Sequence, residues 1–228
     1  MRKLFCLFIA LITFACSVTL VYAVSETLET LPFSDEKIAH FLETIDLEII
    51  QTEPHPRTIC CFDVNSDGLL AVGYQNGNEI AVFSPEGVYL YGFRFQSSGD
   101  YSLVWNGDNI SILFVRSDVI ASFRSDGECV DIRKLTNNAE GSCFMKEMLY
   151  RTERTVGNIT YKMESDIPIA GYARIVAYED GESPRTMYDA SRSHNLSSMI
   201  GLSLFCVFFG SVITYLVCKH RKRRVSDL

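Results

Sequence analysis

The sequence predicts a mainly β fold of repeated four-stranded antiparallel meanders, with one helix before the repeats and a transmembrane helix after them. Short runs rich in β-branched and aromatic residues alternate with turn dipeptides such as Asp67-Gly68. The same order of runs and turns then recurs, so that Gly107 follows Gly68 by 39 residues and Gly127 follows Gly87 by 40. This regular spacing indicates a repeat.

One helix is predicted before the repeats. Ser34 is a favoured N-cap residue, and Asp35 and Glu36 place negative charge at the positive end of the helix dipole. Apolar residues follow at positions i, i+3, i+4 and i+7 across residues 38–45, which gives the helix one apolar stripe. We therefore expect a surface helix packed on a larger body, followed by a strand at residues 47–51.

Three units of short strands are predicted after the helix. Strands are expected at residues 69–72, 79–83 and 88–93 in the first unit, at 110–115, 119–123 and 128–132 in the second, and at 159–163, 173–178 and 184–188 in the third. A repeat of this length is typical of a β-propeller blade, which is a four-stranded antiparallel meander.

The first unit also carries a family resemblance. Residues 62–72, F-D-V-N-S-D-G-L-L-A-V, look like the opening of an NHL-type propeller blade, and residues 78–87, N-E-I-A-V-F-S-P-E-G, look like its continuation. The sequence departs from the family at Glu79, where arginine is usual. The resemblance is best over residues 62–133 and extends through the third unit to about residue 190. It implies a scaffold that binds proteins, glycans or nucleic acid and is usually not a catalyst.

The number of units is too small for a closed propeller. An incomplete ring exposes sheet edges and apolar faces, which are pairing hazards. Three arrangements would deal with these surfaces. The N-terminal segment, with its strand at residues 47–51, could cover an open face. The units could instead form an open sandwich or a stacked meander, or two chains could pair into one closed ring.

Two apolar runs bracket the chain and predict its topology. Arg2 and Lys3 precede the first run, residues 4–24, in which Val21-Tyr22-Ala23 favours cleavage of a signal peptide after residue 23. An uncleaved anchor is the alternative for residues 1–23. The second run, residues 199–218, is uncharged over 20 residues, which is the length that a membrane-spanning helix needs.

A basic cluster follows the second run. It consists of Lys219, Arg221, Lys222, Arg223 and Arg224. Because positively charged flanks stay in the cytoplasm, both runs predict that residues 24–198 lie outside and that the tail, residues 219–228, lies inside. We therefore expect a single-pass protein of the cell membrane with an extracytoplasmic β-rich domain.

The predicted extracytoplasmic domain is strongly acidic. It holds 14 of the 21 Lys and Arg residues and 27 of the 28 Asp and Glu residues, so its net charge is −13. This balance argues against nucleic acid as a partner. Because residues 219–228 are too few for a signalling or catalytic domain, we expect the protein to act through a protein partner in the membrane or through a second copy of itself.

Four cysteines lie in this domain, namely Cys60, Cys61, Cys129 and Cys143. An even number in an exported domain suggests disulfides, and we expect either one long-range disulfide or buried structural thiols. Neighbouring side chains on a strand point to opposite faces, so we expect at most one of Cys60 and Cys61 to face the core. The spacing matches no zinc pattern.

A short acidic motif matches the beginning of a calcium loop. Asp63, Asn65 and Asp67 supply oxygen ligands at alternate positions, and Gly68 follows them. The last position of that loop should be a bidentate glutamate, but it is Tyr74 here. We favour a tight turn between strands and expect neither calcium nor another metal or cofactor.

The sequence carries none of the common catalytic motifs. It holds no G-x-S-x-G elbow, no glycine-rich phosphate loop and no H-E-x-x-H motif. We therefore name no catalytic residue and expect a membrane-anchored binding module rather than an enzyme. A structural component of the envelope is one alternative. A hydrolase of surface polymers is another, and it would need a pair of carboxylates brought together in space.

Overall fold

The structure is a computed structural model that describes residues 30–166, 171–192, 205, 207–209 and 211. The predicted signal peptide, residues 1–23, and the basic tail, residues 219–228, lie outside the described residues, as does most of the apolar run 199–218. Within the described part, no helix combines the length and the apolar character needed to cross a membrane.

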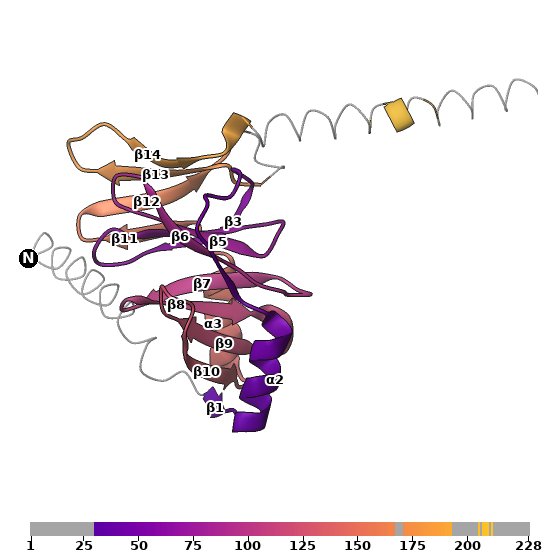
Figure 1. The fold of residues 1–228 in the computed structure, drawn as a ribbon. Coiled ribbons are helices and arrows are strands. Elements are labelled where there is room, and N and C mark those ends of the chain that lie inside the picture. The colour runs from indigo at the N-terminus through magenta and orange to yellow at the C-terminus, as the bar shows by residue number, and fades with distance from the viewer. Residues whose placement is uncertain (1–29, 167–170, 193–204, 206, 210, 212–228) are drawn as a thin grey trace, which may run out of the picture.

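The elements run from strand β1 to strand β14 (Figure 1). The helical elements are α2 (Asp35–Ile45), the 3-10 helix η1 (Val115–Ser117) and α3 (Ala139–Leu149). The strands are β1 (Thr30–Pro32), β2 (Glu48–Ile50), β3 (Ile59–Val64), β4 (Leu70–Tyr74), β5 (Glu79–Phe83), β6 (Tyr89–Arg94), β7 (Tyr101–Asn106), β8 (Asn109–Phe114), β9 (Val119–Phe123), β10 (Cys129–Leu135), β11 (Glu153–Val156), β12 (Ile159–Glu164), β13 (Arg174–Glu179) and β14 (Arg185–Asp189).

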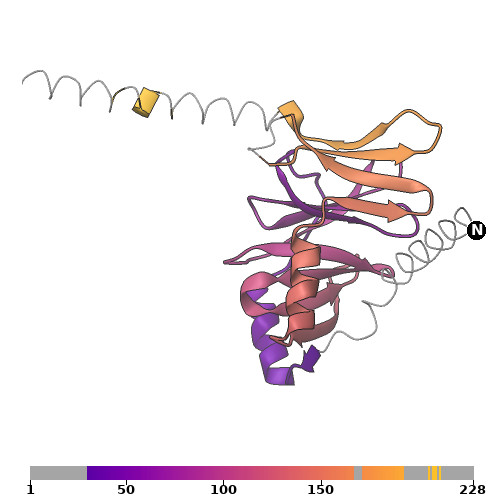
Figure 2. The ribbon, with the colours of Figure 1, turned by 180° about the vertical axis from the view of Figure 1, so that it is seen from behind.

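The strands form three antiparallel sheets that stack face to face (Figures 1 and 2). The first sheet has the order β2-β6-β5-β4-β3, the second β1-β10-β9-β8-β7 and the third β11-β12-β13-β14. The first sheet lies in the middle, because one of its faces packs against the second sheet and the other against the third. The innermost strand β3 contacts both β7 and β11, so the arrangement is propeller-like.

The structure confirms a mainly β fold of repeated antiparallel meanders. Each predicted unit contributes four consecutive strands to one sheet, the three predicted strands and one before them, and this includes the third unit. The four glycines that mark the repeat all adopt positive φ angles between 60° and 83°, namely Gly68, Gly87, Gly107 and Gly127. Since only glycine adopts this conformation readily, the turns that join the strands are encoded locally.

The predicted N-terminal helix is α2. Ser34 occupies its N-cap position, although the serine side chain makes no capping hydrogen bond. Ile45 is buried, and the ring of Phe41 lies 5.2 Å from that of Phe114 in an edge-on contact. The apolar stripe therefore packs on the joint between the first and second sheets, as expected for a surface helix.

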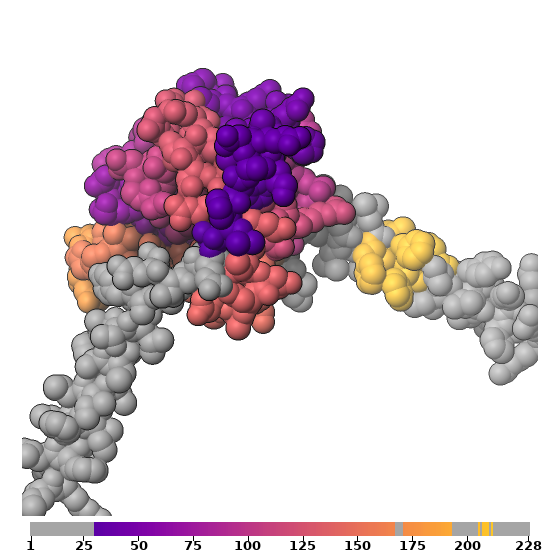
Figure 3. Space-filling model, turned by 90° about the horizontal axis from the view of Figure 1, so that it is seen from below, coloured from indigo at the N-terminus to yellow at the C-terminus, as the bar shows by residue number. Residues whose placement is uncertain are grey.

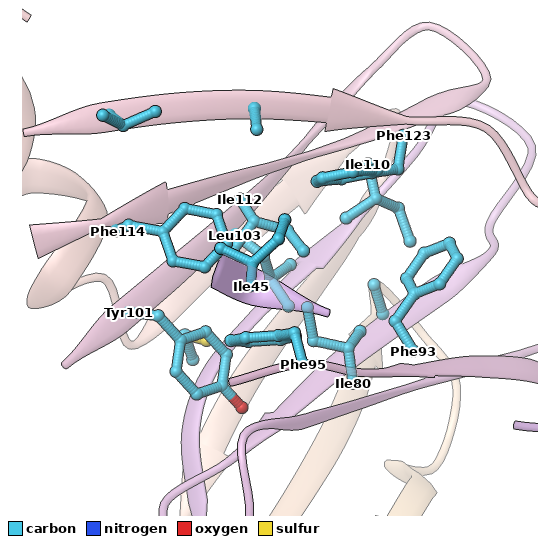
Figure 4. Close-up of a cluster of buried hydrophobic side chains, with 14 of the residues drawn as sticks. Ile45, Ile80, Phe93, Phe95, Tyr101, Leu103, Ile110, Ile112, Phe114 and Phe123 are labelled. Carbon is cyan, nitrogen blue, oxygen red and sulfur yellow. The ribbon is translucent and has the colours of Figure 1, made fainter. Parts of the chain in front are cut away.

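The joint between the first and second sheets is a continuous apolar core. Figure 4 shows side chains of both sheets meeting there, among them Ile80, Phe93, Phe95, Leu103, Ile112 and Phe114. Each of these six is at most 4 % exposed. Burying a side chain of this size contributes about 1.5 to 3 kcal/mol, so this joint is a major source of stability.

A second apolar joint lies between the first and third sheets. Strand β4 shows how one strand serves both joints: Ala71 faces the second sheet, whereas Leu70 and Val72 face the third. Tyr161 and Ile175 contribute to this joint from the third sheet. Because alternate residues point to opposite faces, a strand of the middle sheet must be apolar throughout.

Helix α3, for which the sequence predicted no element, covers the outer face of the second sheet. Met148 of α3 packs against Leu113 and Leu135 of that sheet. The helix begins at Asn138, whose side-chain Oδ1 accepts a hydrogen bond from the Gly141 N–H at 2.7 Å. Figure 3 shows this end of the molecule, where the indigo N-terminal residues lie against later, pink to salmon residues.

The N-terminal strands extend sheet edges. Strand β2 pairs with β6 at the outer edge of the first sheet, and β1 pairs with β10 at the outer edge of the second. The predicted strand at residues 47–51 therefore extends an edge and does not cover an open face. Of the predicted arrangements, this topology resembles the stacked meander.

Candidate functional site

A surface cavity of about 560 Å³ lies at the hairpin that joins β13 to β14. Ile159 and Ala177 form the apolar part of its lining, and Glu179, Glu182 and Arg185 supply charge. Ala177 is buried in the joint between the first and third sheets. The cavity therefore borders the apolar core while its charged lining faces solvent.

Local hydrogen bonds hold this hairpin in place. The Glu182 N–H donates to the Glu179 carbonyl oxygen at 3.1 Å, and Gly181 adopts a φ angle of 84° in the turn. Nδ2 of Asn158, in the neighbouring β11–β12 turn, donates to Oε1 of Glu179 at 2.6 Å. The Glu179 carboxylate is therefore fixed at the cavity, whereas Glu182 and Arg185 are exposed.

In the part of the chain that the structure describes, strand β14 has an unpaired outer edge beside the cavity. The outer strands of the other two sheets, β6 and β10, are covered by β2 and β1. Among the described residues, by contrast, β13 is the one strand that pairs with β14. Arg185 and Thr186 belong to both the edge and the cavity lining. We call strand β14 and the cavity together the β14 site. An unpaired edge offers N–H and C=O groups to another strand.

A buried ionic cluster, the inner-strand junction, lies where the three sheets meet. Asp63 on β3 is completely buried, and its Oδ2 accepts a hydrogen bond from the backbone N–H of Trp105 on β7 at 2.8 Å. Its Oδ1 lies 2.9 Å from Nε of Arg154 on β11 and 3.6 Å from Nη1 of Arg151. Burial raises the pKa of Asp63, whereas Arg154, the Trp105 amide and Arg151 favour its charged form. The junction therefore connects all three sheets.

The side chains of the calcium-loop motif make other contacts in the structure. Asp63 belongs to the inner-strand junction. Oδ1 of Asn65 accepts hydrogen bonds from the backbone N–H groups of Asp67 and Leu69 at 3.0 and 2.8 Å, which forms an Asx turn. Asp67 itself is exposed. In the part of the chain that the structure describes, no three His, Cys, Asp or Glu side chains gather into a metal-binding group.

All four cysteines of the predicted extracytoplasmic domain are free thiols in the structure. Cys61 is buried, Cys143 is exposed, and Cys60 and Cys129 are half-buried. The expectation that only one residue of the adjacent pair faces the core is wrong. A β-bulge shifts the register between Ile59 and Cys61, so Cys60 and Cys61 pack against the same joint, with their Sγ atoms 3.6 Å apart. The bulge breaks the strand alternation on which the expectation rested.

The sequence predicted strands at residues 173–178 and 184–188, but it assigned no binding role to any residue of the β14 site. Asp180-Gly181 is a local signal for the hairpin turn beside it. No local signal marks the unpaired edge, because it results from the pairing of β1 and β2 with the other two sheets and not with β14. The lining of the cavity likewise combines residues of two different hairpins.

Comparisons with known proteins find no matching family model and no matching curated sequence. Among solved structures, a catalytically inactive virginiamycin B lyase from Staphylococcus aureus with quinupristin aligns with 61% of this chain and 44% of its own, at 13% identity and a TM-score of 0.31. A streptogramin B lyase aligns with 61% of this chain and 43% of its own, at 10% identity and a TM-score of 0.28. The matched part spans less than half of either structure, and a similarity this low says nothing about what this chain binds.

Proposed function

We propose that the protein is a membrane-anchored binding module whose extracytoplasmic domain docks a protein partner at the β14 site. The observation that carries this proposal is the outer edge of β14, which no other strand of the described residues pairs with, beside a cavity. An extended segment of the partner would pair with β14 and continue the third sheet.

The chemistry of the site defines the partner segment. Backbone hydrogen bonds to β14 would supply affinity, and the cavity would supply specificity for one side chain. Ile159 and Ala177 favour an apolar group at the base of that side chain. Arg185, with Glu179 and Glu182 close by, favours a polar or charged group at its tip.

The position of β14 in the chain suits a partner in the same membrane. The strand ends at Asp189, and the predicted transmembrane run begins at residue 199. A short tether of this kind would keep the β14 site close to the membrane surface.

Site-specific photo-crosslinking in the native membrane tests the proposal. A photoreactive amino acid at Thr186 should form an adduct with one defined partner, and mass spectrometry should map the link to an extended segment of it. The same group at Thr155, an exposed residue on β11 of the same sheet, is the matched control and should give little adduct. Reversal of charge in Arg185→Glu should weaken the adduct formed from Thr186.

The experiment can also refute the proposal. Equal adduct yields from Thr186 and Thr155 would show that β14 is not a docking edge. A link from Thr186 to a helical or globular surface of the partner would contradict strand addition, although not partner binding itself.

A hydrolase of surface polymers is the second candidate, and one observation favours it. Two carboxylates, Glu179 and Glu182, line the same cavity, and glycoside hydrolysis uses such a pair. We place it second because Glu182 is exposed in a turn, whereas the acid of such a pair usually lies in a less polar environment. Release of reducing sugars from surface polysaccharide that is lost in both Glu179→Gln and Glu182→Gln would favour the hydrolase over the binding module.

A further inference from the structure

A vicinal pair of thiols lies in β3, away from the β14 site. The strand register pairs Ile59 with Tyr74 and Cys61 with Gly73, so Cys60 is the extra residue of a β-bulge. On a regular strand the two cysteine side chains would point to opposite faces. The bulge instead turns both toward the joint between the first and second sheets, where their Sγ atoms lie 3.6 Å apart.

The surroundings leave room for the buried sulfur atom. A Cβ atom at Gly73 would lie only 2.5 Å from Sγ of Cys61 and 3.0 Å from the ring of Tyr101. Tyr101 is in turn held by its hydroxyl, which contacts the carbonyl oxygens of Tyr74 and Glu79 at 3.0 and 2.8 Å. The absence of a side chain at Gly73 therefore creates the space that the Cys61 sulfur occupies.

The two thiols differ in access and in acidity. Cys60 is half-buried, whereas Cys61 is 3 % exposed. The hydrogen bond with Cys61 lowers the pKa of Cys60, and burial raises the pKa of Cys61. Because the thiolate is the reactive form of cysteine, Cys60 is suited to react first and Cys61 to react second.

We infer that Cys60 and Cys61 form a redox modification site that closes to an internal disulfide when a low-molecular-weight disulfide such as oxidised glutathione is the oxidant. The Cys60 thiolate attacks one sulfur of the oxidant, the oxidant's S–S bond breaks, and one thiol leaves. The Cys61 sulfur then loses its proton and attacks Cys60, which expels the second thiol. Two protein thiols are oxidised, and one small disulfide is reduced to two thiols.

Covalent geometry makes this bond reversible. Neighbouring Cα atoms are about 3.8 Å apart across a trans peptide, whereas ordinary disulfides join Cα atoms about 4.4 to 6.8 Å apart. A bond between adjacent cysteines is therefore strained and easily reduced. Formation of the disulfide would also change the packing of Tyr101. The ring of Tyr101 lies beside the pair, and its hydroxyl connects the second sheet to the first.

Peptide mapping of the full chain in detergent tests the inference. Trypsin cuts after Arg57 and Arg94, and residues 58–94 contain Cys60 and Cys61 but no other cysteine. After treatment with oxidised glutathione and alkylation in denaturant, this peptide should carry no alkyl group and should be lighter than the dithiol by two hydrogen atoms. A dithiol reductant should restore two alkylation sites.

Two variants separate the roles of the thiols. Cys61→Ser should trap glutathione on Cys60, because no resolving thiol remains, whereas Cys60→Ser should leave the buried Cys61 unmodified. Cys129→Ser is the matched control and should not change the result. Alkylation of both Cys60 and Cys61 in the treated wild-type chain, or stable glutathione on both, would overturn the inference, and this mass measurement requires no variant to fold.

Discussion

The two outer faces of the three-sheet stack are completed in different ways. On the second sheet, Leu113 and Leu135 make the outer face apolar, and Met148 of helix α3 packs on it. The outer face of the third sheet is polar, and Lys162 pairs there with Glu153 at 3.0 Å. One face is therefore covered by a helix, and the other is compatible with water.

This difference explains how a propeller-like stack of three sheets can be stable. A closed propeller buries every blade face against another blade. Here α3 replaces the missing neighbour of the second sheet, and polar residues remove the need for a neighbour on the third. Pairing of two chains into one closed ring stays a prediction, but neither outer face requires it.

The largest expected effect is on the face covered by the helix. Leu113 is completely buried beneath α3, so Leu113→Ala should lower the free energy of unfolding by about 3 to 4 kcal/mol. Lys162→Ala, on the outer face of the third sheet, should change it by less than about 1 kcal/mol. Denaturant unfolding of the purified chain measures both values. Similar losses in the two variants would mean that the third sheet's outer face is also a packed surface.

The second test compares an ion pair of the inner-strand junction with one on the polar face. Arg154→Ala leaves the buried Asp63 carboxylate with a weaker contact to Arg151, so the loss should be about 3 kcal/mol. Arg174→Ala removes an exposed pair with Asp166 at 2.7 Å and should cost less than about 1 kcal/mol.

A double variant sharpens this test. Asp63→Asn keeps an oxygen that can accept the Trp105 N–H but removes the charge that Arg154 balances. Added to Arg154→Ala, it should therefore recover part of the lost stability. A strictly additive result would show that Asp63 and Arg154 do not act as a pair.

Local patterns predicted those parts of the fold that local chemistry determines. The three predicted strands of each unit and their turns follow from β-rich runs between glycines such as Gly68 and Gly127, which adopt positive φ angles. The innermost strands β3, β7 and β11 were not among the predicted strands. Helix α2 follows from its apolar stripe. Helix α3 carried weaker signals, the N-cap Asn138 and the i, i+4 pair Phe144 and Met148, in a short segment between two units.

Contacts between distant segments could not be predicted in this way. The motif at Asp63 resembled a metal loop, and the arginines that contact its carboxylate, Arg154 on β11 and Arg151 just before this strand, are distant from it in the sequence. Cys60 faces the joint between the first and second sheets because β3 has a bulge, and this bulge forms only when β3 pairs with β4. The β14 site depends on which outer edges β1 and β2 cover. Such features arise from the packing of whole sheets.

A smaller loss of stability is expected when a hydrogen bond between helix α3 and the second sheet is removed. The Ser102 hydroxyl, buried beneath α3, donates to the Met148 carbonyl oxygen at 2.8 Å. Ser102→Ala leaves that oxygen without this partner and should cost about 1 to 2 kcal/mol. Thr155→Ala removes an exposed contact with Thr160 and should have almost no effect. Thermal unfolding of the two variants side by side distinguishes the two faces.

The smallest expected change in unfolding free energy occurs only at alkaline pH. It tests whether water is excluded from the joints between sheets as it is from the face under α3. Burial in the first joint raises the pKa of Tyr91 to about 12, above the value of about 10 for an exposed tyrosine. The folded chain therefore holds the phenol proton longer than the unfolded chain does, and this contribution to stability is lost as the pH rises from about 10 to about 12. Tyr91→Phe has no proton to lose, so its unfolding free energy should fall less steeply over this interval while differing little near neutral pH. Parallel slopes for Tyr91→Phe and the wild type in a series of denaturant titrations would mean that water reaches the joint.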